Sequence, residues 1–238
     1  MPPEISVVYP MYNEEESICR AVQMATDVLA PLTDGNYEIV IVNDASTDRT
    51  GEIAEELAAA DPHIRPSHHE VNRTLGGAIR TGLAHSQGDL VLYMDADLPC
   101  HPRHVRDALP KLEAADVVVG YRTGRHEGAQ RWLYTRVYNA VVRWLFGVKV
   151  KDVNCPFKLF KRAVVEAMDL RSEGSFIDAE MLAEAHRAGF RIAEIPTVFS
   201  PRIAGQSTLA RPRVIVKIVA ELYQYWRRHR GAKKENQR

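Results

Sequence analysis

Two carboxylates, Asp95 and Asp97, follow the apolar run Leu90–Met94 and are separated by Ala96. Because side chains alternate along an extended strand, both carboxylates point to the same side of the chain where the run ends. Converging carboxylates repel each other unless a cation or a proton lies between them. Hard divalent cations prefer oxygen ligands and are commonly shared with the phosphates of a substrate. The pattern therefore predicts a Mg²⁺ or Mn²⁺ site, and a solvated acidic turn is the alternative.

Similar polar clusters follow other apolar runs in the first half of the chain. The runs Ile5–Pro10 and Tyr37–Val42 are typical of buried strands, and each is followed by a segment with helical spacing. Strands that alternate with helices predict an α/β fold with a mostly parallel sheet and helices on both faces. Ligands of such a sheet bind outside the carboxyl ends of the strands. We therefore expect the clusters at Asn13–Glu14, Asn43–Asp48 and Asp95–Asp97 to face one ligand.

The same alternation continues through the second half of the chain. Helices are also predicted at 50–60 and 72–86, with a short strand at 63–69 between them. The elements predicted after Asp97 are a helix at 104–114, a strand at 116–120, a helix at 131–146, a strand at 148–153, a helix at 176–188 and a strand at 192–199.

The composition narrows the class of protein. The 238 residues suffice for one large domain, which we place at residues 1–209, with a tail at 210–238. Lys plus Arg (31) equals Asp plus Glu (31), so no net positive charge favours nucleic acid as a partner. The chain opens directly with a strand and has no apolar run of the ~20 residues that a membrane-spanning helix needs. We therefore expect a cytoplasmic location.

Cysteine and histidine residues give no metal or disulfide pattern. Cys19, Cys100 and Cys155 are odd in number and far apart in the sequence, which is typical of free thiols. The histidines lack metal-ligand spacing, so we expect them at the surface.

The C-terminal segment Pro212–Trp226 predicts an amphipathic helix rich in Val, Ile, Leu, Tyr and Trp. The basic stretch Arg227–Arg230 follows it, with Lys233 and Lys234 further on. An apolar, aromatic face next to cations is typical of a helix that lies on an anionic membrane surface. The helix predicted at 131–146 shares this pattern more weakly, and together they predict peripheral association with the cytoplasmic face of a membrane. The alternative is packing against the core, a second copy of the chain in a homodimer, or a membrane-protein partner.

Short motifs occur in a fixed order over residues 4–209. They are P-x-Y-N-E (Pro10–Glu14), N-D-A-S-T-D (Asn43–Asp48), N-R-T-L-G-G-A (Asn72–Ala78), D-A-D (Asp95–Asp97), G-Y-R (Gly120–Arg122), C-P-F-K-L-F (Cys155–Phe160), F-I-D-A-E (Phe176–Glu180) and R-I-A-G-Q-S (Arg202–Ser207). With these motifs the chain resembles the family 2 glycosyltransferases of the GT-A fold. Within that family it is similar to the dolichyl- and polyprenyl-phosphate hexose synthases.

Three features depart from the family pattern. Asn43 stands where the family often has an Asp, which removes one charge from the base and ribose contacts. Thr208 stands where a Lys usually follows the serine of the last motif, which removes one cation near the phosphates. Many relatives carry C-terminal transmembrane helices, and this sequence contains none.

On the donor side, the resemblance implies that Asp97, together with Asp95 through the metal or a water, acts on the diphosphate of a nucleotide sugar. A cation on both phosphates stabilises the charge that develops on the leaving group. Asp44 is expected to contact the base or ribose, whereas Ser46 is expected to cap the helix that follows, as Asp48 also could. A glycine at a helix N-terminus also suits an anion. The implied donor-binding residues are Pro10, Tyr12, Glu14, Asn43, Asp44, Asn72, Gly77, Asp95, Ala96 and Arg202.

On the acceptor side, Arg122 and Arg136 are expected to bind a phosphate, because guanidinium matches phosphate oxygens with two hydrogen bonds. Arg131 could take the place of Arg136, and a surface position is the alternative for each arginine. Asp178 stands where the family has a carboxylate near the acceptor. For a hydroxyl acceptor it would be the general base, whereas an ionised lipid phosphate needs only orientation. Glu180 is a weaker candidate, with a helix-surface position as the alternative. The implied catalytic residues are Asp97, Asp178, Arg122 and Arg136.

These roles predict a metal-dependent, inverting transfer of mannose or glucose to a polyprenyl phosphate by a single in-line displacement. The donor would be GDP-mannose or UDP-glucose, and catalysis would come from positioning and electrostatics. Two alternatives remain open at this point. One is transfer to a soluble or protein-linked hydroxyl, and the other is a non-catalytic subunit that binds nucleotide sugars.

Overall fold

A single mixed sheet organises the chain in the computed structural model, which describes residues 3–97, 100–123, 129–198 and 212–229, with the backbone alone at 129–134 and 212–216. Within these ranges the sheet has seven strands in the order β3-β2-β1-β4-β6-β5-β7. The strands are β1 (Ile5–Met11), β2 (Tyr37–Asn43), β3 (Ile64–His68), β4 (Leu90–Met94), β5 (Val117–Thr123), β6 (Phe157–Lys161) and β7 (Ile192–Val198). The domain boundary predicted between residues 209 and 210 lies outside the described residues.

The sheet is mostly parallel, as predicted, with one reversed strand. β3, β2, β1 and β4 run parallel to one another, and β5 runs parallel to β7. β6 is antiparallel to both β4 and β5. Its first residue, Phe157, therefore lies opposite Met94, the last residue of β4.

Both faces of the central strands are buried, which explains their continuous apolar sequences. On β1, Val7 and Tyr9 belong to the core on one face of the sheet, whereas Val8 belongs to the core on the other. On β2, Ile41 and Val42 divide between the two cores in the same way. The period of two along each strand thus supplies both hydrophobic layers.

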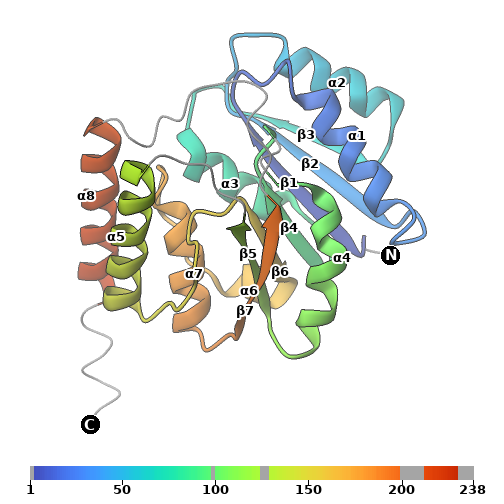
Figure 1. The fold of residues 1–238 in the computed structure, drawn as a ribbon. Helices are drawn as coiled ribbons and strands as arrows, with labels where there is room; N and C mark the ends of the chain where they lie inside the picture. The colour runs from blue at the N-terminus through green and yellow to red at the C-terminus, as the bar shows by residue number, and fades with distance from the viewer. Residues whose placement is uncertain (1–2, 98–99, 124–128, 199–211, 230–238) are drawn as a thin grey trace.

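Helices cover both faces of the sheet (Figure 1). Residues of α1, α2 and α4 pack into the core on one face, and residues of α3, α6 and α7 pack into the core on the other. The helices are α1 (Ile18–Leu29), α2 (Thr50–Ala60), α3 (Thr74–His85), α4 (Val105–Ala108), α5 (Ala129–Phe146), α6 (Arg162–Ala167), α7 (Ile177–Arg187) and α8 (Pro212–His229).

The strand predicted at 148–153 is wrong. Val148, Val150 and Val153 are buried in the core, but the segment is neither helix nor strand. Side chains satisfy its backbone in place of a neighbouring strand. Glu194 accepts the Lys151 N–H at 2.6 Å, and the side-chain amide of Asn139 donates to the Lys151 carbonyl at 2.7 Å. The alternating apolar residues of this segment are buried, but they do not form a strand. The next strand in the chain is β6, which begins at Phe157.

The helix predicted at 104–114 is broken into short pieces. Two 3₁₀ turns, Pro102–His104 and Leu109–Glu113, flank the single α-helical turn of α4. Pro110 lacks a backbone N–H and so cannot continue the α-helical hydrogen bonding. His104 is buried within this region, contrary to the surface position expected for the histidines.

The C-terminal helix α8 has one packed face and one exposed face. Tyr225 is 5% exposed, and its ring lies 4.9 Å from the ring of Phe146 on α5, so the two helices lie side by side at one edge of the molecule (Figure 1). Val219 and Tyr223 are 58% and 56% exposed. Within the part of the chain that is described, no helix is both long enough and apolar enough to cross a bilayer.

Candidate active site

Segments from four strands meet at the carboxyl edge of β1, β2 and β4. Met11 at the end of β1 lies opposite Asn43 at the end of β2, and β4 runs in the same direction beside β1. Because β6 runs in the opposite direction, the segment that leads into Phe157 enters the sheet at this same edge. The polar clusters that follow β1, β2 and β4 therefore lie along one edge, where an open α/β sheet binds ligands.

The D-A-D segment directly follows β4, with Ala96 buried between its two carboxylates. The hydroxyl of Tyr93 donates to Oδ1 of Asp95 at 2.9 Å. Burial raises the pKa of Tyr93 well above its ordinary value, and the charges of three carboxylates add to this shift: Asp178, Asp95 and Asp97. Asp178 pairs with Lys158 of β6, which lies opposite Tyr93 in the sheet, so Asp178 lies near the D-A-D segment although it is far away in the sequence.

The donor atoms at D-A-D fit a hard divalent cation. Asp95 and Asp97 offer carboxylate oxygens, which are the ligands that Mg²⁺ and Mn²⁺ prefer. Among the described side chains, no group of three or more His, Cys, Asp or Glu is arranged to hold a metal ion. Mg²⁺ is usually held by one or two carboxylates together with substrate phosphates. A site with two carboxylates therefore suits a cation that arrives with, or is completed by, a diphosphate.

Asp44 is held firmly at the end of β2. Its Oδ1 lies 2.6 Å from ring Nδ1 of His69 and accepts the backbone N–H of Arg73 at 2.7 Å. The other ring nitrogen of His69 lies 2.9 Å from the hydroxyl of Thr81 on α3. The side chains of His69 and Asp44 are each 4% exposed, so the expected surface position of His69 is wrong. His69 instead fixes the orientation of the carboxylate that is predicted to contact the nucleoside.

The loops after β1 and β2 are joined by side-chain to backbone hydrogen bonds. Asn13 has a left-handed backbone (φ 57°), and its Oδ1 accepts the Thr47 N–H at 2.8 Å. Its own N–H donates to the Ser46 hydroxyl at 3.0 Å. Ser46 therefore links the two loops and does not cap the helix, whereas Asp48 accepts the Thr50 N–H at 2.9 Å.

Asn43 is engaged in the turn at the end of β2. Its Oδ1 accepts the Ser46 N–H at 3.1 Å, and its Nδ2 lies 3.0 Å from Nδ1 of His68. Asn43 is 7% exposed, and both ends of its side-chain amide have protein partners. The main role of this amide in the structure is therefore to stabilise the turn. The role of Asn43 as a direct contact to the donor stays a prediction.

The remaining predicted residues of the first motif lie at the same edge. Pro10 is buried in β1 opposite Val42, beyond Val8, which is the last residue of β1 paired with β4. Proline is tolerated here because its missing N–H removes no bond to β4. Tyr12 is 49% exposed, and Glu14 is partly buried.

The G-G pair at the start of α3 allows close approach of another loop. A Cβ on Gly76 would lie 2.2 Å from the carbonyl oxygen of Ser172, and the Gly76 N–H donates to the Glu173 carbonyl at 2.7 Å. A Cβ on Gly77 would lie 2.4 Å from the Cβ of Arg73. The structure thus accounts for both glycines by packing.

Other N–H groups at this end of α3 also have protein acceptors. Oδ1 of Asn72 accepts the Thr74 N–H at 3.0 Å, and Nδ2 of Asn72 donates to the carbonyl of Asp44 at 3.1 Å. The Arg73 N–H binds Asp44, as described above. Asn72 therefore ties the helix start to the end of β2, and these N–H groups are not available to a phosphate.

Asp178 lies in the first turn of α7 and is 7% exposed. Lys158 on β6 forms an ion pair with Oδ1 of Asp178, and its Nζ also donates to the carbonyl of Cys155 at 2.8 Å. Lys158 is 0% exposed. Burial raises the pKa of Asp178 above its ordinary value, and Lys158 offsets part of that rise. Asp178 is thus a desolvated carboxylate near the D-A-D segment.

Arg122 at the end of β5 is buried in a two-point ion pair with Asp152. Its Nε lies 2.6 Å from Oδ2, and its Nη2 lies 3.0 Å from Oδ1. The side chains are 7% and 4% exposed. The charge of Asp152 raises the pKa of Asp178 and that of Arg122 lowers it. The Arg122 guanidinium already has a carboxylate partner.

The other predicted arginines are less closely defined. Arg136 is exposed on α5. The side chain of Arg131, and all of Arg202, lie outside the described residues. Their contacts to an acceptor or to phosphates stay predictions.

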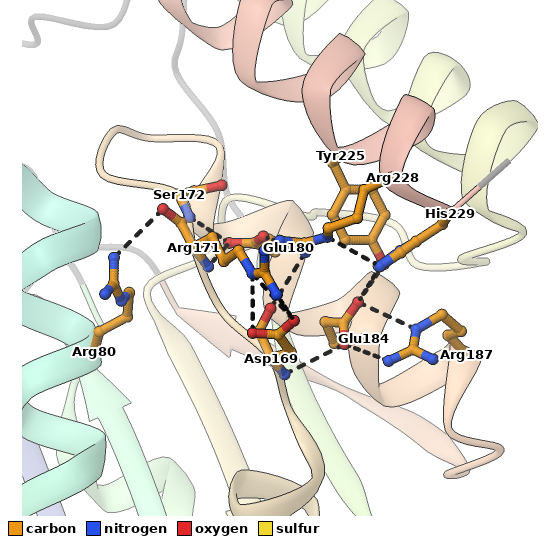
Figure 2. A network of polar contacts seen from close by, with 10 residues as sticks. All are labelled: Arg80, Asp169, Arg171, Ser172, Glu180, Glu184, Arg187, Tyr225, Arg228 and His229. Atoms are coloured by element: carbon orange, nitrogen blue, oxygen red, sulfur yellow. Dashed lines mark hydrogen bonds and ion pairs between the residues drawn. The ribbon is translucent and has the colours of Figure 1, made fainter. Parts of the chain in front are cut away.

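A second polar network anchors α7 to α8 (Figure 2). Glu180 accepts the Ser172 N–H at 2.7 Å and pairs with Arg228 at 3.0 Å, while Glu184 accepts the Tyr225 hydroxyl at 2.8 Å. Glu180 is 1% exposed, so the helix-surface position considered for it is wrong. It positions the helix that carries Asp178.

Sequence reasoning missed three residues of this site. Lys158 is a charge inside the apolar run Phe157–Phe160, and a charge in a buried strand needs a partner. His69 directly follows β3, just as Asp44 follows β2, so the strand-end rule could have found it. Asp152 carries no comparable signal, because its segment resembles a strand.

Comparison with known proteins identifies the family of this chain. The family model described as "Glycosyl transferase family 2" matches residues 6–169. Glycosyltransferase AglD of Haloferax volcanii is 32% identical over 94% of this chain and 37% of its own length. An undecaprenyl-phosphate 4-deoxy-4-formamido-L-arabinose transferase of Shewanella sediminis is 32% identical over 85% of this chain and 61% of its own length.

A dolichol-phosphate mannosyltransferase of Pyrococcus furiosus is 28% identical over 92% of this chain and 63% of its own length. The chain thus spans less than two thirds of the length of these curated relatives. Glucosyl-3-phosphoglycerate synthase from Mycobacterium tuberculosis, solved with Mn²⁺, UDP and glucosyl-3-phosphoglycerate, has a TM-score of 0.71 at 24% identity, covering 93% of this chain and 79% of that one. That likeness shows the GT-A type of fold. By its family match, this chain belongs to glycosyl transferase family 2.

Proposed function

We propose that the chain transfers mannose or glucose from a nucleotide diphosphate sugar to a polyprenyl phosphate, with Mg²⁺ or Mn²⁺ at Asp95 and Asp97. The observation that carries this proposal is the D-A-D pair at the carboxyl edge of β4, with the buried Asp178 joined to β6 beside it through Lys158. A pair of carboxylates suits a cation with a diphosphate, and a desolvated third carboxylate suits an acceptor site.

The names of similar proteins support the two substrate classes. Two relatives are named for transfer involving undecaprenyl phosphate and dolichol phosphate. The solved neighbour binds Mn²⁺ and UDP together with a glucosylated product. A uridine or guanosine donor and a lipid-phosphate acceptor therefore form the proposal that we test first.

The proposed reaction is one in-line displacement. An oxygen of the acceptor phosphate forms a bond to C1 of the sugar, and the bond from C1 to the diphosphate oxygen breaks with its electron pair. Inversion follows, so an α-linked donor gives a β-linked product. A divalent cation, when bound, stabilises the charge on the departing diphosphate. In this proposal Asp44 with His69 orients the nucleoside and Asp178 orients the acceptor, and Arg122 and Arg136 are the cations assigned to the acceptor phosphate.

The direct test is a panel of donors and acceptors. The protein is incubated with GDP-mannose or UDP-glucose and Mg²⁺ or Mn²⁺, with undecaprenyl phosphate, with a soluble hydroxyl acceptor, or with neither. We expect glycolipid only with the lipid phosphate and only with a divalent cation. Turnover on the hydroxyl acceptor alone would replace this proposal by the second enzymatic alternative, and donor binding without any turnover would favour a non-catalytic subunit.

A lipid acceptor requires access to a membrane surface, and the exposed side chains of α5 and α8 fit one. Trp144 on α5 is 83% exposed, and Tyr223 on α8 is 56% exposed. The exposed cations Arg143 and Arg227 belong to the same two helices. Exposed aromatic residues together with cations are typical of helices that bind anionic membranes. We therefore assign these exposed side chains to an anionic lipid surface.

Replacing Trp144 and Tyr223 together by serine should weaken binding to anionic vesicles about tenfold, because two exposed aromatic side chains no longer enter the interface. Flotation with phosphatidylglycerol vesicles measures the effect. Val71→Ser, at a residue 66% exposed on another part of the surface, is the control and should float like the unmodified chain. Undiminished flotation of the double variant would remove these side chains from the proposal.

A further inference from the structure

The reversed strand β6 delivers a lysine to the candidate site. Lys158 lies opposite Tyr93 on β4 and opposite Val119 on β5, in the middle of the sheet. It is fully buried, and its Nζ lies 5.3 Å from the centre of the Tyr93 ring. Tyr93 in turn donates to Asp95. Burying a charged lysine at such a position costs desolvation free energy unless the ammonium group is paired. The partners of Lys158 therefore indicate its role.

The partners of Lys158 fix its ammonium group from two sides. Nζ donates to the Cys155 carbonyl at 2.8 Å and pairs with Oδ1 of Asp178. Oδ1 and the carbonyl lie on different segments, the start of α7 and the loop before β6. Lys158 therefore ties the helix that carries Asp178 to the loop at the active edge, and it leaves the orientation of the carboxylate little freedom.

The other groups around Asp178 do not replace this lysine. Arg122 lowers the pKa of Asp178, but Arg122 is paired with Asp152, whose own charge raises it. Tyr93 and Tyr138 also lie within electrostatic reach of Asp178, and both are phenols with raised pKa values. Among the described groups, Lys158 is thus the cation whose hydrogen bond reaches Asp178 directly.

We propose that Lys158 is a positioning residue that keeps Asp178 ionised and oriented toward the acceptor. The proposal rests on the proposed function for the role of Asp178, and it goes beyond that function by assigning the lysine of C-P-F-K-L-F. If the ion pair had only a structural role, removing Lys158 would lower the stability of the fold and leave kcat unchanged. If Lys158 positions Asp178, removing it also lowers kcat, and it does so only while Asp178 is present.

The first test is the pH dependence of transfer by Lys158→Met, with UDP-glucose or GDP-mannose and undecaprenyl phosphate. Without the ammonium group, burial of Asp178 is no longer offset, so its pKa rises further. We expect kcat to fall about tenfold or more at neutral pH and the acidic limb of the pH profile to move to higher pH. Lys158→Arg keeps the charge and should restore the profile in part.

Lys161→Met is the matched control, because Lys161 lies on the same strand as Lys158. Its Nζ pairs with Oδ1 of Asp116 at 3.1 Å and not with Asp178. This variant should leave the pH profile unchanged. A Lys158→Met chain with an unchanged profile and a lowered Tm only would overturn the proposal.

A second comparison is decisive even if Lys158→Met alone does not fold. It measures kcat of Asp178→Asn and of the double variant Asp178→Asn/Lys158→Met. The double variant removes both charges, which buried ion pairs tolerate better than loss of one partner. If Lys158 acts through Asp178, removing it in this background should change kcat less than about threefold. A further tenfold loss would show an independent role and contradict the proposal.

Urea unfolding of these variants at different pH values tests the ion pair without any activity measurement. It therefore distinguishes failure of this inference from failure of the proposed function. If the unmodified chain transfers sugar to none of the acceptors, the proposed function fails, and urea unfolding of the same variants still tests the pair. Burial raises the pKa of Asp178 above 3.8 even with Lys158 present, so in Lys158→Met the folded pKa should lie higher still. Stability should then be lost as pH rises from 3.8 through the folded pKa, relative to the double variant. Parallel pH curves would contradict the inference.

Discussion

Asp97→Ala is expected to lower kcat of sugar transfer by about 10³-fold or more, with little change in the Tm. The reason is that a diphosphate leaving group develops charge in the transition state, and a cation held by the D-A-D pair stabilises it. Asp97 is partly exposed at the end of β4, so its removal leaves no cavity in the core. The measurement is initial rate against Mg²⁺ or Mn²⁺ concentration, followed by nucleoside diphosphate release.

The control for this experiment lies beside the opposite end of β4. Asp89 directly precedes β4 at the opposite end, and its side chain is exposed. Asp89→Ala changes the net charge equally but should leave both kcat and the cation dependence unchanged. Unchanged turnover in both Asp95→Ala and Asp97→Ala would refute the assignment of the cation site.

Asp178→Asn should lower kcat by about 10²-fold with a lipid phosphate acceptor while the KM for the donor stays nearly constant. Asparagine keeps the shape and a carbonyl oxygen that can still accept from Lys158, so the helix start should remain folded. The loss is confined to the charge that orients the acceptor. Because burial raises the pKa of Asp178, the unmodified chain should lose activity as pH falls through that raised pKa, and Asp178→Asn should lack this limb.

The size of this effect also distinguishes the two acceptor classes. A lipid phosphate is already ionised near neutral pH, whereas a hydroxyl must lose its proton during transfer. General-base catalysis contributes about 10²- to 10⁴-fold, so a hydroxyl acceptor should show the larger loss in Asp178→Asn. Equal activity of the variant and the unmodified chain on every acceptor would remove Asp178 from the site, whatever the acceptor is.

The first half of the fold could be predicted closely from local patterns. β4 and α2 have the predicted bounds, because a buried run with polar ends or a helix stopped by Pro62 contains its own boundaries. The same holds for the strand-end clusters around Asp44 and Asp97. Parallel strands place their carboxyl ends along one edge, so their sequence positions alone place them there.

The second half could not be predicted in the same way. The segment 148–153 and the strand β6 are both apolar, and local pattern does not tell whether a neighbouring strand or a side chain will accept their N–H groups. The reversal of β6 is a matter of long-range pairing, which no local signal carries. The motif that contains Lys158 was recognised, but its role depends on that reversal.

The sequence by itself thus determined the family, the α/β class and the position of the D-A-D carboxylates, because strand period and motif spacing are local properties. Only the tertiary structure decided which charges pair with one another. Lys158 with Asp178, His69 with Asp44, and Arg122 with Asp152 each join segments far apart in the chain. Buried charges must find partners wherever the fold brings opposite charges together, and that choice is made by packing and strand direction rather than by neighbours in the sequence.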